Sequence, residues 1–222
     1  MNFSMIFDMD GTLFQTDKIL EISLEETFQE LRQKGLWEKE TPIEKYRQIM
    51  GVPLSVVWET LLPTHPSEIR TMANEFFHDQ LIYNIQNGNG DLYPRVEELF
   101  TFLKNRNIPT FIASNGLPNY LESIVKYYHL DNWVQEVFSI QQIKSKDKSD
   151  LVQMILEKYK IQRGAVVGDR LSDIKAAKSN GLYAIGCRFD FAQEDELAHA
   201  DFIIDDLMEI SEIIKEEEGI TR

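Results

Sequence analysis

Two aspartates, Asp8 and Asp10, directly follow a short apolar stretch near the start of the chain. That stretch, residues 3–7, predicts a strand buried on both faces. Buried carboxylates need a compensating cation, and open α/β sheets bind ligands at the carboxyl ends of their strands. Gly11 and Thr12 continue the run as a tight turn whose backbone N–H groups can face an anion. The run therefore indicates a phosphate and metal site, although Asp10-Gly11 alone is equally typical of an ordinary turn.

Polar residues also end two later predicted strands. Ser114 and Asn115 follow one of them, and Asp169 follows another, with Asp173 one helical turn further on. Because the carboxyl ends of parallel strands face one edge of a sheet, these groups meet if the strands are neighbours. A cluster of carboxylates repels itself without a cation, and oxygen ligands suit Mg²⁺. The sequence therefore predicts a Mg²⁺ site whose ligands come from Asp8, Asp10, Asp169 and Asp173.

A basic run lies between the third predicted strand and the helix that follows it. A phosphoryl site needs a cation on the side away from the metal, where charge spreads over the phosphate oxygens. Lys148 is the first choice, because Ser149 or Asp150 can cap the helix and place this lysine at its N-terminal end. Lys146 is the second choice and Lys144 the third. Such a run is ordinarily solvated surface, and only its position among the strand ends favours a functional role.

The order of the predicted elements indicates the fold class. From residue 93 onward, helices and strands alternate, which predicts right-handed βαβ units on a parallel sheet. The predicted strands are residues 3–7, 110–113, 137–140, 165–167, 183–186 and 202–204. Between the first two strands the pattern is helical only, and it ends in a flexible Asn-Gly-rich segment. We therefore predict an α/β core from residues 1–14 and 92–222 and a helical domain from residues 15–91.

Composition limits the partners of the protein. The chain has 222 residues, 43% of them hydrophobic and 27% charged, which is typical of a globular protein. A formal charge of −14 argues against nucleic acid or an anionic membrane as the main partner. A single cysteine, Cys187, forms no internal disulfide, and neither a signal segment nor a membrane-length apolar run is evident. We predict a cytoplasmic protein, a monomer or homodimer, that acts on a small molecule.

The ordered set of motifs resembles the haloacid dehalogenase superfamily. It comprises Asp-x-Asp-Gly-Thr-Leu at residues 8–13, a strand-end Ser-Asn, a lysine that opens a helix, and Gly-Asp-(x)₃-Asp at residues 168–173. The helical insert is similar to the cap of the phosphoglycolate phosphatase-like branch. The resemblance implies a Rossmann-like core with a small helical cap, and a phosphatase that hydrolyses a small phosphomonoester: phosphoglycolate, a sugar phosphate or a nucleotide.

The resemblance also implies a role for each matching residue. Asp8 attacks phosphorus and becomes an aspartyl phosphate, while Asp10 protonates the leaving oxygen and later activates water. Mg²⁺ is bound by Asp8, by the Asp10 carbonyl and by Asp169, with Asp173 close by or bridging through water. The transferring phosphate is held by Thr12, Ser114, Asn115 and Lys148.

Several positions depart from the family pattern. Gln15 stands where many relatives have an acidic residue, Arg95 stands where a glycine is common, and no prolines follow the lysine. Specificity is expected in the cap, where the candidates are Gln15, Arg47, Gln48 and Trp58.

Two other functions stay open from the sequence. A sugar-phosphate mutase of the β-phosphoglucomutase type is the nearest enzyme, although the segment at residues 51–54 lacks the basic residue that grips a second phosphate. A phosphoacceptor or binding module without enzymatic activity is the other, and the proton-handling Asp10 counts against it.

Overall fold

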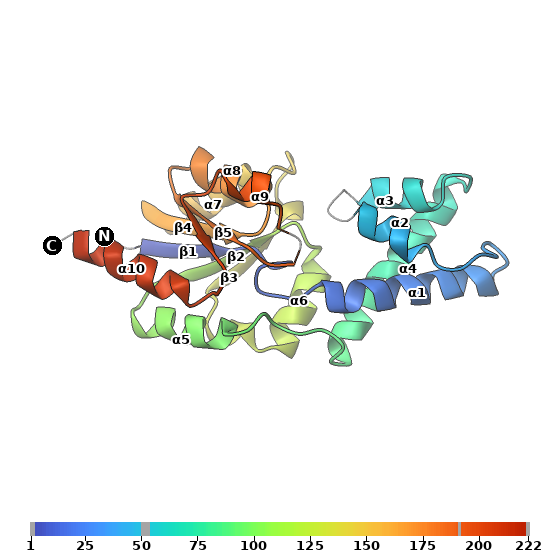
Figure 1. Cartoon of the computed structure of the whole chain (residues 1–222), viewed down its shortest axis with the longest axis horizontal. Coiled ribbons are helices and arrows are strands. Elements are labelled where there is room, and N and C mark those ends of the chain that lie inside the picture. The colour runs from blue at the N-terminus through green and yellow to red at the C-terminus, as the bar shows by residue number, and fades with distance from the viewer. Residues whose placement is uncertain (1–2, 50–53, 191, 221–222) are drawn as a thin grey trace. The chain divides into compact units, whose positions relative to one another are not determined.

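The computed structural model describes residues 3–49, 54–190 and 192–220. The chain divides into two compact units, of which the first combines Met1–Gln15 with Asp91–Arg222 and the second is Thr16–Gly90. The first unit contains the sheet, and the second contains helices only within its described residues (Figure 1).

A six-stranded parallel sheet forms the centre of the first unit, in the order β3-β2-β1-β4-β5-β6. The strands are β1 (Phe3–Phe7), β2 (Thr110–Ser114), β3 (Glu136–Ser139), β4 (Arg163–Gly168), β5 (Tyr183–Cys187) and β6 (Phe202–Ile204). Strand β1 is central: its last residue, Phe7, lies beside Ile112 of β2 and Val167 of β4. The predicted α/β parallel-sheet fold is confirmed, and the C-terminal ends of β1, β2 and β4 are adjacent at one edge.

Helices cover both faces of this sheet. They are α5 (Val96–Asn105), α6 (Pro118–Tyr127), α7 (Lys148–Tyr159), α8 (Leu171–Ser179), α9 (Glu194–Leu197) and α10 (Glu209–Ile220). Helices α7 and α8 pack on one face, and α5 and α10 lie on the other (Figure 1). On the α7–α8 face, Leu151 and Ile174 join a buried cluster with Val166 of β4. On the other face, the ring of Phe7 contacts Phe100 edge-on, with 5.3 Å between centroids. These apolar contacts fix the strands and therefore the residues at their ends.

The second unit contains α1 (Asp17–Gln33), α2 (Ile43–Gln48), α3 (Leu54–Leu61) and α4 (Ser67–Gln86). The long helices α1 and α4 pack together. A polar contact crosses this packing, because the side-chain amide of buried Asn84 donates to Ser23 Oγ at 3.1 Å. Across residues 3–49, 54–190 and 192–220, no helix has the length and apolar character needed to span a membrane.

The structure corrects some predicted boundaries. Strand β3 begins and ends one residue before the predicted segment, because Ser139 caps a 3₁₀ turn at Ile140–Gln142. Arg95, which stands where the family commonly has a glycine, has a φ of 68° in the left-handed region, and α5 begins at Val96. The short helix α9 was not predicted.

Candidate active site

The turn after β1 presents Asp8 at the sheet edge. The N–H of Asp8 donates to the carbonyl of Val167 at 2.8 Å, which extends the pairing of β1 with β4 by one residue. The chain then turns, with the N–H of Leu13 donating to the carbonyl of Met9 at 2.9 Å. Gly11 has a φ of +73°, and a Cβ there would lie 2.5 Å from Asp169 Oδ2. Both the backbone and the neighbouring carboxylate therefore require glycine at this position.

Three buried carboxylates gather at this edge. Asp8, Asp169 and Asp173 each offer an oxygen, and these oxygens lie within 4.8 Å of one another. Asp169 directly follows β4, and Asp173 lies in the first turn of α8, where its Oδ2 accepts from the N–H of Arg170 at 3.1 Å. Gly168 makes room for this arrangement, because a Cβ there would lie 2.1 Å from Asp173 Cγ. The structure thus brings together three of the four predicted aspartate side chains.

Lys148 lies within this cluster. Its Nζ is 2.7 Å from Asp8 Oδ1 and 2.5 Å from Asp173 Oδ1, and its side chain is only 2% exposed. It is the first residue of α7, and the helix is capped by Asp147, whose Oδ1 accepts from the N–H of Ser149 at 2.8 Å. The prediction that Ser149 or Asp150 caps this helix was therefore wrong.

The two alternative lysines lie elsewhere. The side chains of Lys144 and Lys146 are exposed, whereas Lys148 is buried against two carboxylates. The geometry therefore distinguishes among three lysines that the sequence could only rank.

The charges of the cluster do not balance. Three carboxylates face one lysine. Burial raises the pKa of Asp8 well above its usual value, although Lys148 lowers it. Burial and the neighbouring Asp173 raise the pKa of Asp169 to about 7. For Lys148, burial lowers the pKa, but Asp173 and Asp8 outweigh it and raise the value overall. A buried set of oxygen donors with excess negative charge fits a divalent cation such as Mg²⁺.

The other predicted phosphate-binding residues differ in burial and in their contacts. Thr12 is fully buried, and its hydroxyl donates to Asp169 Oδ1 at 3.3 Å. Ser114 is also fully buried at the end of β2, and its Oγ accepts from the N–H of Gly116 at 2.9 Å. Asn115, the next residue, is exposed.

Asp10 has a different environment from the other aspartates. Its side chain is outside the three-carboxylate cluster found among the described residues. Its Oδ1 accepts a hydrogen bond from the hydroxyl of Tyr120 at 2.5 Å. Tyr120 could not be singled out from its position in the chain, because an aromatic residue near the start of a helix is typical of core packing.

The comparisons with known proteins identify the family. The model of the haloacid dehalogenase-like hydrolases matches residues 5–187, which span β1 to β5. The chain belongs to this family. The resemblance inferred from the motifs is confirmed, and so is the prediction of a hydrolase of this kind.

Relatives of this hydrolase cover nearly its whole length. It is 23% identical over 223 residues to pyrophosphatase PpaX of Listeria monocytogenes, with 97% of each chain covered. It is 23% identical over 220 residues to phosphoglycolate phosphatase of Vibrio vulnificus, with 94% of each covered. A crystal structure of a predicted phosphoglycolate phosphatase from Haemophilus somnus has the same fold. Its TM-score is 0.82 at 19% identity, covering 96% of this chain and 98% of that one.

Trp58 and Arg47, two of the residues predicted to set specificity in this hydrolase, have side-chain partners in the structure. Trp58 is 2% exposed, and its Nε1 donates to Asn74 Oδ1 at 2.9 Å, which indicates a packing role. Arg47 makes a two-point ion pair with Glu21, at 2.5 and 2.9 Å.

The remaining specificity candidates have less defined environments. The side-chain amide of Gln15 donates to the Leu92 carbonyl at 2.6 Å, and Gln48 is exposed. Of the segment at residues 51–54 that argues against a mutase, residues 51–53 lie outside the described residues.

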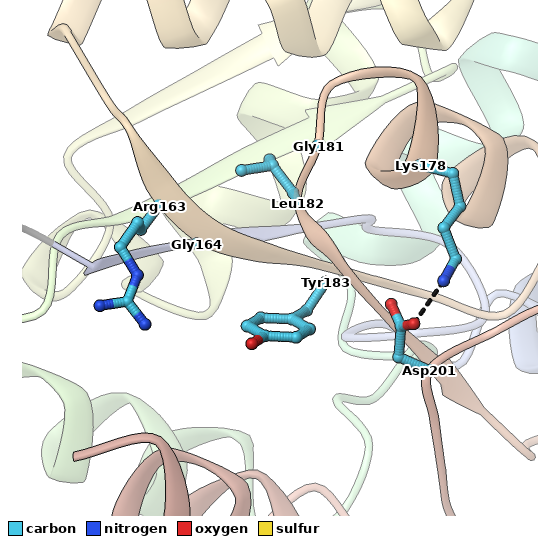
Figure 2. A pocket seen from close by; sticks show the side chains of 7 residues that line it. All are labelled: Arg163, Gly164, Lys178, Gly181, Leu182, Tyr183 and Asp201. Carbon is cyan, nitrogen blue, oxygen red and sulfur yellow. Dashed lines mark hydrogen bonds and ion pairs between the residues drawn. The ribbon is translucent and has the colours of Figure 1, made fainter. Parts of the chain in front are cut away.

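A pocket of about 350 Å³ in the first unit lies away from the carboxylates (Figure 2). It is formed at the N-terminal ends of β4 and β5, whereas the cluster follows the C-terminal ends of β1 and β4. It contains the ion pair between Lys178 and Asp201 and is lined by Arg163, Gly164, Lys178, Gly181, Leu182, Tyr183 and Asp201. This pocket is separate from the candidate active site.

Proposed function

We propose that this hydrolase is a Mg²⁺-dependent phosphatase that cleaves a small phosphomonoester through an aspartyl phosphate on Asp8. The observation that carries the proposal is the buried Asp8 carboxylate, which pairs with Lys148 and lies beside Asp169 and Asp173. The ammonium group of Lys148, next to Asp8, can offset the charge of a phosphate bound there. The relatives named as a pyrophosphatase and a phosphoglycolate phosphatase give independent support for phosphate hydrolysis.

The first half-reaction transfers the phosphoryl group to the enzyme. A carboxylate oxygen of Asp8 attacks phosphorus, and the bond from phosphorus to the ester oxygen breaks. Asp10, as general acid, gives its proton to the departing oxygen, and the alcohol leaves. Lys148 and the hydroxyl of Thr12 are positioned at the same edge to stabilise the charge on the phosphate oxygens.

The second half-reaction returns the enzyme to its starting state. Asp10, now a carboxylate, takes a proton from water as the water oxygen attacks phosphorus. The bond between phosphorus and the Asp8 oxygen breaks, and inorganic phosphate leaves. A single carboxyl group thus acts first as acid and then as base, which regenerates both aspartates.

The metal is assigned to the carboxylate cluster. Asp8, Asp169 and Asp173 would hold it, together with the backbone carbonyl of Asp10. When bound, Mg²⁺ neutralises negative charge on the transferring phosphate. Ser114 and Asn115 are assigned to the phosphate from the other side, next to the N-terminus of α6.

We extend the proposal to the rest of the molecule. The helical unit at Thr16–Gly90 is assigned as a cap that excludes water and sets the choice of leaving group. The protein is proposed to be cytoplasmic and a monomer or homodimer, and size-exclusion chromatography with light scattering tests the last point.

A phosphate-release screen tests the proposed function. The purified protein is incubated with a panel of phosphoglycolate, sugar phosphates, nucleotides and pyrophosphate, in Mg²⁺ and in EDTA. We expect release from at least one compound in Mg²⁺ and none in EDTA. Asp8→Asn should abolish release, whereas Asp131→Asn, an exposed aspartate away from the site, should not. Metal-independent release, or full activity of Asp8→Asn, would reject the mechanism.

The same screen separates the phosphatase from a mutase. A mutase moves phosphate between positions of a sugar, so the sugar phosphate is isomerised while little inorganic phosphate appears. Following the products by ³¹P NMR distinguishes the two, and isomerisation without release would replace hydrolysis as the proposed activity.

A further inference from the structure

Tyr120 connects a helix of the core unit to Asp10. It lies in the first turn of α6 and is only 4% exposed. Its hydroxyl donates to Asp10 Oδ1 at 2.5 Å, across 110 residues of sequence. This O–H···O distance lies at the short end of the range for hydroxyl hydrogen bonds, about 2.5–3.0 Å.

The backbone around Tyr120 is anchored at several points. Its N–H donates to Asn119 Oδ1 at 3.0 Å, and its carbonyl accepts from Ser123 Oγ at 2.6 Å. The preceding loop is fastened as well, because Ser139 Oγ donates to the carbonyl of Gly116 at 2.6 Å. The Ser139 contact ties the loop before α6 to the end of β3, and the other two contacts hold the first turn of the helix.

The ring of Tyr120 packs closely against the same loop. A Cβ on Gly116 would lie 3.1 Å from Tyr120 Cδ1, so glycine at this position lets the ring approach the backbone. With the ring packed and the backbone anchored, little freedom remains for the hydroxyl. Its position is therefore set by the protein before any substrate binds.

We propose that Tyr120 is a positioning residue for Asp10, an inference that rests on the proposed function. The last torsion of an aspartate side chain is broad, so an unrestrained carboxyl group rotates freely. By donating to Oδ1, Tyr120 fixes the plane of the carboxylate and assigns proton transfer to the other oxygen. Asp10 is then oriented to protonate the departing oxygen. The conformational entropy of its side chain is lost when the protein folds and not during the reaction.

A purely structural role for Tyr120 makes a different prediction. If the hydroxyl only satisfies its own hydrogen-bonding need, its removal affects all substrates alike or none. If it orients the general acid, its removal affects only the substrates whose leaving group needs a proton. The leaving group therefore separates the two explanations.

Tyr120→Phe tests the proposal, because it removes the hydroxyl and keeps the ring. The activity is measured on the best alkyl phosphate of the screen and on p-nitrophenyl phosphate, whose leaving group needs little protonation. We expect kcat for the alkyl phosphate to fall about tenfold or more, which is part of the roughly 10²–10⁴-fold that general acid–base catalysis contributes, with KM little changed. Activity on p-nitrophenyl phosphate should stay within about twofold. Tyr127→Phe, an exposed tyrosine on the same helix, should behave like wild type.

A second readout does not depend on activity. The unfolding midpoint is measured in EDTA for Tyr120→Phe, Asp10→Ala and the double variant. We expect Tyr120→Phe to lower the midpoint when Asp10 is present and to have little further effect in the Asp10→Ala background, because the two residues share one contact.

The outcomes separate this inference from the proposed function. Equal losses on both substrates, or no loss on either, overturn the positioning role while leaving a phosphatase in place. Additive effects on the unfolding midpoint overturn the contact itself. A wild-type protein that releases no phosphate overturns the proposed function, and with it the positioning role, while the midpoints still report on the contact.

Discussion

Replacement of Lys148 by methionine tests whether the buried charge cluster is held together as described. Methionine keeps most of the side-chain length and removes the charge. The Nζ of Lys148 contacts Asp8 Oδ1 at 2.7 Å and Asp173 Oδ1 at 2.5 Å. At an effective dielectric of about 20, each contact is worth roughly 6 kcal/mol before the desolvation penalty is subtracted. The measured cost of removing one partner of a buried pair is about 3–5 kcal/mol.

The loss should appear as lower stability without metal. In EDTA at neutral pH, we expect the free energy of unfolding of Lys148→Met to fall by about 3–5 kcal/mol. For a chain of this size, this lowers Tm by roughly 6–20 °C. Urea denaturation followed by circular dichroism measures the difference. Excess Mg²⁺ should reduce it, because a bound cation also offsets the charge of the carboxylates.

The pH dependence of this loss has a definite sign. Without the lysine, nothing in the cluster opposes the raised pKa of Asp8, so the folded protein binds more protons than the unfolded chain and is destabilised as pH rises. The difference between Lys148→Met and wild type should therefore shrink at lower pH. Lys146→Met, an exposed neighbour, should change stability by no more than about 0.5 kcal/mol. A Lys148→Met protein within about 1 kcal/mol of wild type in EDTA would refute the charge argument.

Three further predictions concern the same unit. The pKa of Asp169 is raised to about 7, so the stabilising proton on the metal-free protein is lost as pH rises through that value. In the proposed metal site, Mg²⁺ would replace this proton, so the rise in Tm that Mg²⁺ causes should be larger at about pH 7.5 than at about pH 5.5 by scanning calorimetry; an equal rise contradicts this. Gly168→Ala should weaken Mg²⁺ binding at least tenfold in calorimetric titration, because its Cβ would displace Asp173, and unchanged affinity would count against Asp173 as a ligand. Arg95→Gly should be about 1 kcal/mol more stable in urea than Arg95→Ala, because only glycine adopts the φ of 68° without strain, and the reverse order would show that strain is absent.

The sheet was predictable because its signals are local. Buried parallel strands are continuous apolar runs, and the polar residues that end them mark the sheet edge where ligands bind. Strands β1 and β6 were predicted with their observed limits, and the other strands within a residue or two. Asp8 and Asp169 were expected to converge because each follows a strand of the same parallel sheet. In the structure, Phe7 of β1 pairs with Val167 of β4, so the two strands end at the same level of the sheet.

Other features could not be read from the sequence because they depend on neighbours far along the chain or on the local backbone angles. Arg95 adopts a left-handed conformation in which its side chain makes ion pairs with Glu98 and with Asp206, a residue more than a hundred positions later. The helix cap at Asp147 was misassigned by two residues or more, because Asp147, Ser149 and Asp150 are all good capping residues. Choosing among them requires the backbone angles.

The two glycines of the site show how sequence and tertiary structure combine. Gly11 follows Asp10 in a turn, and a turn alone explains a glycine there. The structure adds a second requirement, since a Cβ at Gly11 would meet the carboxylate of Asp169, and a Cβ at Gly168 would meet that of Asp173. Each glycine therefore makes room for an acidic side chain. The carboxylates can crowd within 4.8 Å because backbone, rather than side chain, lies behind them. Such crowding of like charges is unfavourable for the fold alone, which favours a cation as the reason for it.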